Sequence, residues 1–76
     1  MGIKTVAEYV QFYVGLGMEG SISLSSFARN EKLVLKHKLE NSNIPREQVL
    51  HGLELLDELL REVGTSGEQA VITKYT

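Results

Sequence analysis

Three side chains that can bind metal ions follow one another in the second half of the chain. Glu47, His51 and Glu54 are spaced by four and three residues, which places them on one face of a helix. Carboxylate and imidazole groups are common zinc ligands. No second set of ligands accompanies them, because the chain has no cysteine and its only other histidine is His37. The sequence therefore predicts no metal site and no cofactor.

A catalytic site is not predicted either. No motif brings together a nucleophile, a base and an oxyanion-binding group. The glycine-rich segment GLGMEG, residues 15–20, lacks the preceding strand and the spacing of a phosphate-binding motif, so its glycines indicate the end of a helix. We expect that the protein is not an enzyme.

Basic and acidic residues are segregated along the chain, although the formal net charge is only −2. Residues 29–46 contain five basic and two acidic residues, whereas residues 47–68 contain six acidic residues and one basic residue, Arg61. Arg29, Lys32 and Lys36 are spaced to form a stripe on one side of a helix. Such a stripe is either a solvated helix face or a set of contacts for nucleic-acid phosphates. The acidic balance by itself argues against general nucleic-acid binding.

The chain of 76 residues is long enough for one domain but short for a stable monomer. Domains of this size bury only about 60% of the surface that the unfolded chain exposes. Without cysteine, disulfide bonds cannot compensate, so oligomerisation is the expected remedy. No apolar run approaches the roughly 20 residues of a membrane span, and no secretory leader is recognisable. We expect a cytoplasmic protein with no membrane partner.

A long helix is predicted over residues 44–63, and its apolar surface is wide for so small a protein. Pro45 suits the first turn, because its missing N–H would have no partner there. Leu50, Leu55 and Leu59 widen an apolar stripe formed by positions 49, 53, 56, 60 and 63. Gly52, inside the helix, costs up to about 1 kcal/mol of helix propensity and indicates a close approach by another helix. The width of the stripe predicts a partner.

Shorter elements precede and follow this helix. A capping box at Thr5 and Glu8 begins a helix over residues 5–15. Residues 21–25, Ser-Ile-Ser-Leu-Ser, alternate polar and apolar side chains, which favours a short strand over a loop. A second helix is expected from residue 25 or 26 to about residue 40, followed by a tight turn. Gly64 is expected to end the long helix, and residues 67–76 to form a flexible tail or a short strand.

The order of a strand, a helix, a tight turn and a second helix over residues 21–63 resembles the ribbon-helix-helix family of DNA-binding regulators. The sixteen residues between Phe27 and Ile44 are similar in length to the first helix and turn of that family. The segment IPREQVL, residues 44–50, looks like the opening of its second helix. The resemblance implies a mostly α-helical homodimer whose strands pair as an antiparallel ribbon. The domain would cover residues 1–66 and carry an additional N-terminal helix.

In this family the ribbon enters the major groove of DNA, and the start of the second helix holds a backbone phosphate. The resemblance implies double-stranded DNA as a partner, contacted by Ser21, Ser23, Ser25, Arg29, Lys32, Lys36 and Arg46. The implied dimer core consists of Ile22, Leu24, Val49, Leu53, Leu56 and Leu60.

The chain departs from the family in several places. Its strand carries only serines where family members display longer side chains that contact bases. Pro45 stands where a Ser or Thr cap is common, and Asn43 replaces a frequent turn glycine. The basic N-terminal arm is also missing, so specificity would come from the helix over residues 5–15, from Arg29 or from DNA shape.

Two functions remain open. The leading expectation is a dimeric, sequence-specific DNA-binding protein that acts as a transcriptional repressor of plasmid, phage or bacterial origin. The alternative is a three-helix protein-interaction module, an adaptor or inhibitor that binds a partner helix through the leucine-rich face of residues 44–63. The layout favours the first function, whereas the acidic charge and the serine-only strand favour the second.

Overall fold

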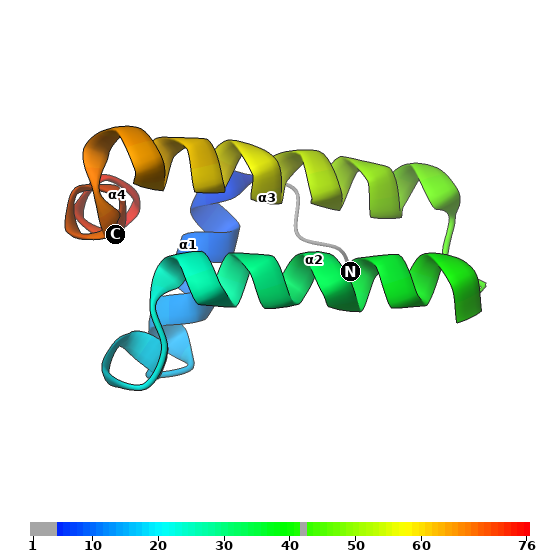
Figure 1. Ribbon diagram of the computed structural model, residues 1–76, viewed down its shortest axis with the longest axis horizontal. Helices are drawn as coiled ribbons and strands as arrows, with labels where there is room; N and C mark the ends of the chain where they lie inside the picture. The colour runs from blue at the N-terminus through cyan, green and yellow to red at the C-terminus, as the bar shows by residue number, and fades with distance from the viewer. Residues whose placement is uncertain (1–4, 42) are drawn as a thin grey trace.

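The computed structural model describes residues 5–41 and 43–76, and every element of regular secondary structure within these ranges is a helix (Figure 1). Its elements are α1 (Val6–Gly15), the 3-10 turn η1 (Met18–Gly20), α2 (Leu24–Asn41), α3 (Arg46–Ser66) and α4 (Glu68–Tyr75). The two long helices α2 and α3 form an antiparallel hairpin, and α1 crosses behind both of them (Figure 1). The short helix α4 lies at the end of the hairpin away from the α2–α3 connection.

The strand predicted at residues 21–25 is wrong, and with it the ribbon-helix-helix fold. The described residues contain no strand, because residues 21–23 form a turn and α2 already begins at Leu24. The Ser23 hydroxyl accepts a hydrogen bond from the backbone N–H of Ser26 at 3.1 Å. The Ser23 carbonyl accepts another from the N–H of Phe27 at 2.9 Å. The serine therefore caps a helix, an arrangement that competes locally with strand pairing.

Helix α1 holds this turn in place. It begins where the capping box predicted a helix, with the Thr5 hydroxyl accepting a hydrogen bond from the N–H of Glu8 at 3.2 Å. Near its other end, the Tyr13 hydroxyl donates a 2.6 Å hydrogen bond to the carbonyl of Ile22. The Tyr13 ring also packs against Phe27 of α2, with 5.2 Å between ring centroids. The turn before α2 is thus fixed by α1 of the same chain.

The chain after residue 63 also differs from the prediction. Helix α3 continues past Gly64 to Ser66 and ends at Gly67, whose φ of +90° lies in the region that favours glycine. Residues 68–75 form α4 in place of the expected tail or short strand. Val71 of α4 is fully buried, and the Glu68 carboxylate accepts a 2.9 Å hydrogen bond from the N–H of Ser25 at the start of α2. Tertiary contacts therefore decide the structure of this β-prone segment.

A single hydrophobic core joins the four α-helices of the described residues. Its buried members come from every one of these helices and are Val6, Tyr9, Val10, Tyr13, Leu24, Phe27, Ala28, Leu55, Leu56, Leu59 and Val71. Because α1 and α4 pack against the same end of the hairpin, this core lies there (Figure 1). The end that carries the α2–α3 connection extends beyond them.

Gly52 lies where neighbouring side chains approach α3 closely. A Cβ atom at this position would be 2.9 Å from Cδ1 of Leu35 and 3.3 Å from the hydroxyl oxygen of Tyr9. Leu35 belongs to α2 and Tyr9 to α1, so both helices direct a side chain at the glycine. The close approach expected from the sequence is present, and the glycine makes room for it.

Candidate interaction surface

The three serines that the resemblance assigned to DNA bases lie at the start of α2. Ser21 and Ser23 are exposed in the turn, and Ser25 is in the first turn of the helix. The Ser23 hydroxyl is used as a helix cap and also donates to the hydroxyl of Ser26 at 3.0 Å. Without a strand, these side chains do not form the row that would face a groove of DNA.

The four predicted phosphate contacts are distributed over both long helices. Arg29 and Lys36 are exposed on α2, and Arg46 is exposed as the first residue of α3. Lys32 lies between the first two but is partly buried, because its ammonium group forms a 2.5 Å ion pair with Asp57 of α3. Since α2 and α3 are antiparallel, Arg46 lies at the opposite end of the hairpin from Arg29. The structure brings Arg29 and Lys36 together on one side of α2 and leaves Arg46 apart from them.

Most of the predicted dimer core is already covered within one chain. Leu24 and Leu56 are completely buried, and Val49 is only 1% exposed. Ile22 and Leu60 are partly buried against the core, and Leu53 is also half-buried. The apolar stripe of α3 is wide because it faces α1, α2 and α4 of its own chain, so these leucines offer a second copy little surface.

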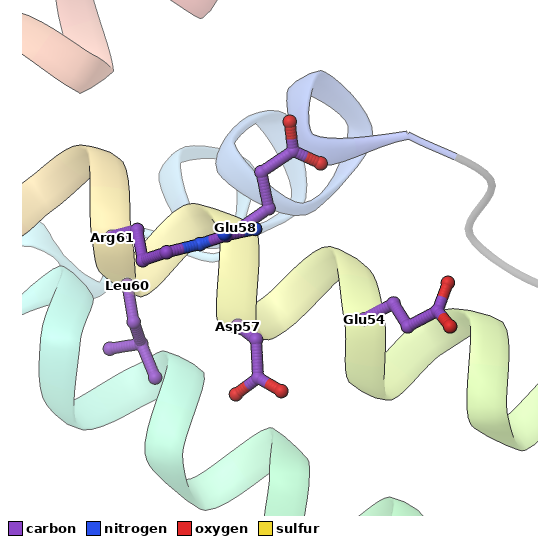
Figure 2. A pocket seen from close by; sticks show the side chains of 5 residues that line it. All are labelled: Glu54, Asp57, Glu58, Leu60 and Arg61. Carbon is purple, nitrogen blue, oxygen red and sulfur yellow. The ribbon is translucent and has the colours of Figure 1, made fainter.

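The surface that α3 leaves uncovered combines leucines with carboxylates. Its residues recur at helical spacing and are exposed or half-buried: Leu50, Leu53, Glu54, Asp57, Glu58, Leu60 and Arg61. We refer to this set as the α3 face. Five of its members, from Glu54 to Arg61, line a shallow depression (Figure 2). In Figure 2, Asp57 and Leu60 point toward α2, and Glu58 points to the other side of α3.

Charge and apolar area on the α3 face suit a particular kind of ligand. Leu50 is 40% exposed and so offers apolar area to a ligand. Glu54 follows Leu50 one turn along the helix, and Asp57, Glu58 and the base Arg61 follow over the next two turns; of the three carboxylates, Asp57 is paired with Lys32. Such a face can bury leucine side chains of a partner while its carboxylates attract basic groups, which is how amphipathic helices are bound.

The neighbouring surface of α2 has the opposite character. Arg29, Leu33 and Lys36 are spaced by four and three residues and are all exposed. Leu33 is 65% exposed, the most of any large apolar residue in the described chain. We refer to these three residues as the α2 stripe.

Helix α4 is fastened to α3 on another side. The Glu62 carboxylate accepts hydrogen bonds from Lys74 at 2.8 Å and from the Tyr75 hydroxyl at 2.8 and 2.9 Å. The bond from Lys74 is the main reason that the pKa of Glu62 lies below its ordinary value. Gln11 of α1 adds a 3.1 Å hydrogen bond to the carbonyl of Tyr75. These bonds fix α4 over the core and keep it off the α3 face.

No metal centre is visible in residues 5–41 and 43–76. Glu47, His51 and Glu54 share a side of α3, but no three His, Asp or Glu side chains of these ranges gather closely enough to hold an ion. None of the helices described is long and apolar enough to cross a membrane.

Comparisons with protein-family models, with curated proteins and with solved structures gave no match.

Sequence reasoning missed the α2 stripe and the fastening of α4. Leu33 fits neither the apolar nor the basic side expected for the second helix. Its position between Arg29 and Lys36 was the available signal. The link from Glu62 to Lys74 and Tyr75 joins residues 12 and 13 apart across the turn at Gly67, and no local pattern indicates it.

Proposed function

We propose that the protein is a protein-interaction module whose α3 face binds a basic amphipathic helix of a partner. The observation that carries this proposal is that one side of α3 exposes Leu50 together with the carboxylates of Glu54, Asp57 and Glu58 in the turns that follow it. A cytoplasmic location, expected from the sequence, belongs to the same proposal.

Support comes first from the shape of the surface. The α3 face runs along a long helix, and at its edge toward α2 it presents Leu60 and Asp57 (Figure 2). A helix laid along this edge would place its own leucines against Leu50 and Leu53. Its flanking lysines or arginines would then meet Glu54 and Glu58. Amphipathic helices that bind in grooves use anchoring side chains three, four and seven residues apart, and these contacts have that spacing.

DNA binding keeps less support than it had from the sequence. The ribbon that would read base edges does not form in the described residues, and Lys32 is engaged with Asp57. Arg29 and Lys36 remain exposed and could still meet phosphates. They stand in a chain of net charge −2 and lie beside the acidic α3 face, which repels a polyanion.

The proposal is tested with the full chain and three fluorescently labelled probes. These are an 18-residue leucine–lysine amphipathic helical peptide, the corresponding leucine–glutamate peptide, and a 20-base-pair DNA duplex. We expect the lysine peptide to bind, the glutamate peptide not to bind, and the DNA to bind more weakly than the lysine peptide at low salt. Methyl NMR shifts should fall on Leu50 and Leu53 and spare Val10.

Matched variants locate the site. The double substitution Glu54→Gln and Glu58→Gln should weaken binding of the lysine peptide by about ten-fold, because two carboxylates leave the rim. The control, Glu31→Gln and Glu40→Gln on α2, removes the same charge from the same protein. If both double variants bind equally well, or if DNA binds more tightly than the lysine peptide, the proposal is wrong.

A further inference from the structure

Two adjacent surfaces of the chain complement each other but do not meet within one molecule. The α3 face presents Leu50 followed by three carboxylates, whereas the α2 stripe presents two bases on either side of Leu33. The helices that carry them lie side by side in the hairpin, so both surfaces are available to one partner. The α2 stripe is itself a short basic amphipathic row of the kind proposed above as a ligand.

We propose that the partner helix is α2 of a second copy of this chain, so that two hairpins pair face to face with each α2 stripe on the α3 face of the other copy. This inference rests on the proposed function and names the partner. It differs from the ribbon-helix-helix dimer, because it uses exposed residues and leaves the buried leucines inside each chain.

Symmetry selects one arrangement of the two copies. A two-fold axis perpendicular to the helices would place α2 on α2, with bases facing bases. An axis parallel to the helices places α2 of one copy antiparallel on α3 of the other, and both such contacts form at once. Opposite charges then meet at both contacts, which favours this arrangement over the first.

The register of this pairing follows from contacts within the hairpin. Lys32 is level with Asp57, because the two form an ion pair. Leu35 is level with Gly52, because a Cβ atom added at the glycine would touch the Leu35 side chain. An axis parallel to the helices preserves these levels between the copies. Lys36 of one copy is then level with residues 50–54 of the other, where Glu54 is the acidic group. Leu33, one turn before Lys36, is level with residues 54–56, and the nearest leucine of the α3 face is Leu53.

The size of the face limits the strength of the dimer. The two longest extents of the molecule are 35 and 22 Å. A face bounded by them is at most close to the roughly 800 Å² that each partner contributes to an interface of standard size. With few apolar anchors on it, we expect reversible association in the micromolar range or weaker, at about 10–100 µM.

Sedimentation velocity over about 5–500 µM tests the inference, since this range spans the expected dissociation constant. The wild type should change from monomer to dimer across the range, and added salt should weaken the dimer. Lys36→Glu and Glu54→Lys should each weaken self-association by about ten-fold, because each homodimer then holds two like-charged pairs. Lys38→Glu is the matched control, because this exposed lysine of α2 is two residues from Lys36 and points to a different side.

Mixing the two variants gives the decisive measurement. In the heterodimer of Lys36→Glu with Glu54→Lys, both contacts again join opposite charges, so association should return to the wild-type strength within about three-fold. A variant that had only lost its fold could not recover in this way. Failure of the mixture to associate, or an equal loss in Lys38→Glu, would overturn the inference.

The outcome also separates this inference from the proposed function. A wild type that stays monomeric at the highest concentration but binds the lysine peptide refutes the dimer and leaves the interaction module standing. A wild type that neither dimerises nor binds the peptide refutes both. Dimerisation that the charge variants do not change refutes the proposed geometry.

Discussion

Replacing Tyr13 by phenylalanine removes one hydroxyl and keeps the ring that packs on Phe27. The hydroxyl donates a 2.6 Å hydrogen bond to the carbonyl of Ile22, in the turn that replaces the predicted strand. The substitution therefore tests whether α1 holds this turn. Tyr13 is almost completely buried and Ile22 half-buried, so the carbonyl left behind is only partly open to water.

The expected loss of stability combines two contributions. A hydrogen bond between neutral groups is worth about 0.5–1.5 kcal/mol net, and a buried carbonyl left without a donor costs about 1–3 kcal/mol. Because water can reach part of the Ile22 carbonyl, we expect a total of about 1–2 kcal/mol. For a domain of this size each kcal/mol lowers the melting temperature by about 4–8 °C.

Urea unfolding followed by circular dichroism measures this loss, with Tyr9→Phe as the control. Tyr9 lies on the same helix and is similarly buried, but its hydroxyl has no hydrogen-bond partner among residues 5–41 and 43–76. The control should change the free energy of unfolding by less than about 0.5 kcal/mol. Equal effects of the two substitutions would show that the bond to Ile22 does not hold the turn.

The same variant has a second readout at high pH. Burial, and then the carboxylates of Glu68 and Glu19, raise the pKa of Tyr13 above its ordinary value of 10.0. The folded chain thus keeps a proton that the unfolded chain releases, so stability falls as the pH rises above 10. Tyr13→Phe should make this fall shallower. An unchanged pH dependence would contradict the assignment.

Three further predictions address the core, the glycine and the α4 fastening. Leu56→Ala should cost about 2–5 kcal/mol in urea unfolding, because Leu56 is completely buried; a loss below about 1 kcal/mol would contradict its place in the core. Gly52→Ala should change the free energy of unfolding by no more than about 1 kcal/mol, because the gain in helix propensity offsets the cost of shifting the flexible Leu35 side chain. Gly52→Leu should be strongly destabilising, because the larger side chain has no room there. Equal effects of the two substitutions in thermal melts would argue against the close approach. Glu62→Gln should reduce the loss of folding stability at low pH, because the lowered pKa of Glu62 contributes stability that is present above about pH 4.5 and lost as the pH falls through that pKa. Unfolding free energies measured from pH 3 to 7 check this, and a parallel loss of stability in the wild type and the variant would refute it.

Local signals in the sequence located the helices better than they located the turn. The Thr5 cap and the position of Pro45 before α3 act through atoms within a few residues, so they can be read from the sequence. The Ser-Ile-Ser-Leu-Ser alternation satisfies both a strand and a helix cap, and what decides between them is the distant Tyr13 hydroxyl. In the same way α4 depends on Glu68 reaching Ser25, 43 residues away.

The candidate site could be predicted only in its composition. The acidic and basic halves of the hairpin were visible in the order of the residues. Which leucines remain exposed was not, because that depends on where α1 and α4 pack. Leu55 and Leu59 are buried against these helices, whereas Leu50, more than one turn before Leu55, stays in solvent.

The packing of α1 and α4 also changes what kind of partner the chain needs. If the whole apolar stripe of α3 were open, association would have to complete the core, and the folded monomer would not be stable. Because Leu24, Leu56 and Val49 are buried within one chain, the core is complete without a partner. The apolar side chains that stay exposed in the described residues include two leucines, Leu33 and Leu50, one on each long helix and each with charged neighbours. Surfaces of this composition resemble those of reversible complexes, in which charge selects the partner and a small apolar centre holds it. We therefore expect association to be tuned by salt and charge, and folding to proceed without it.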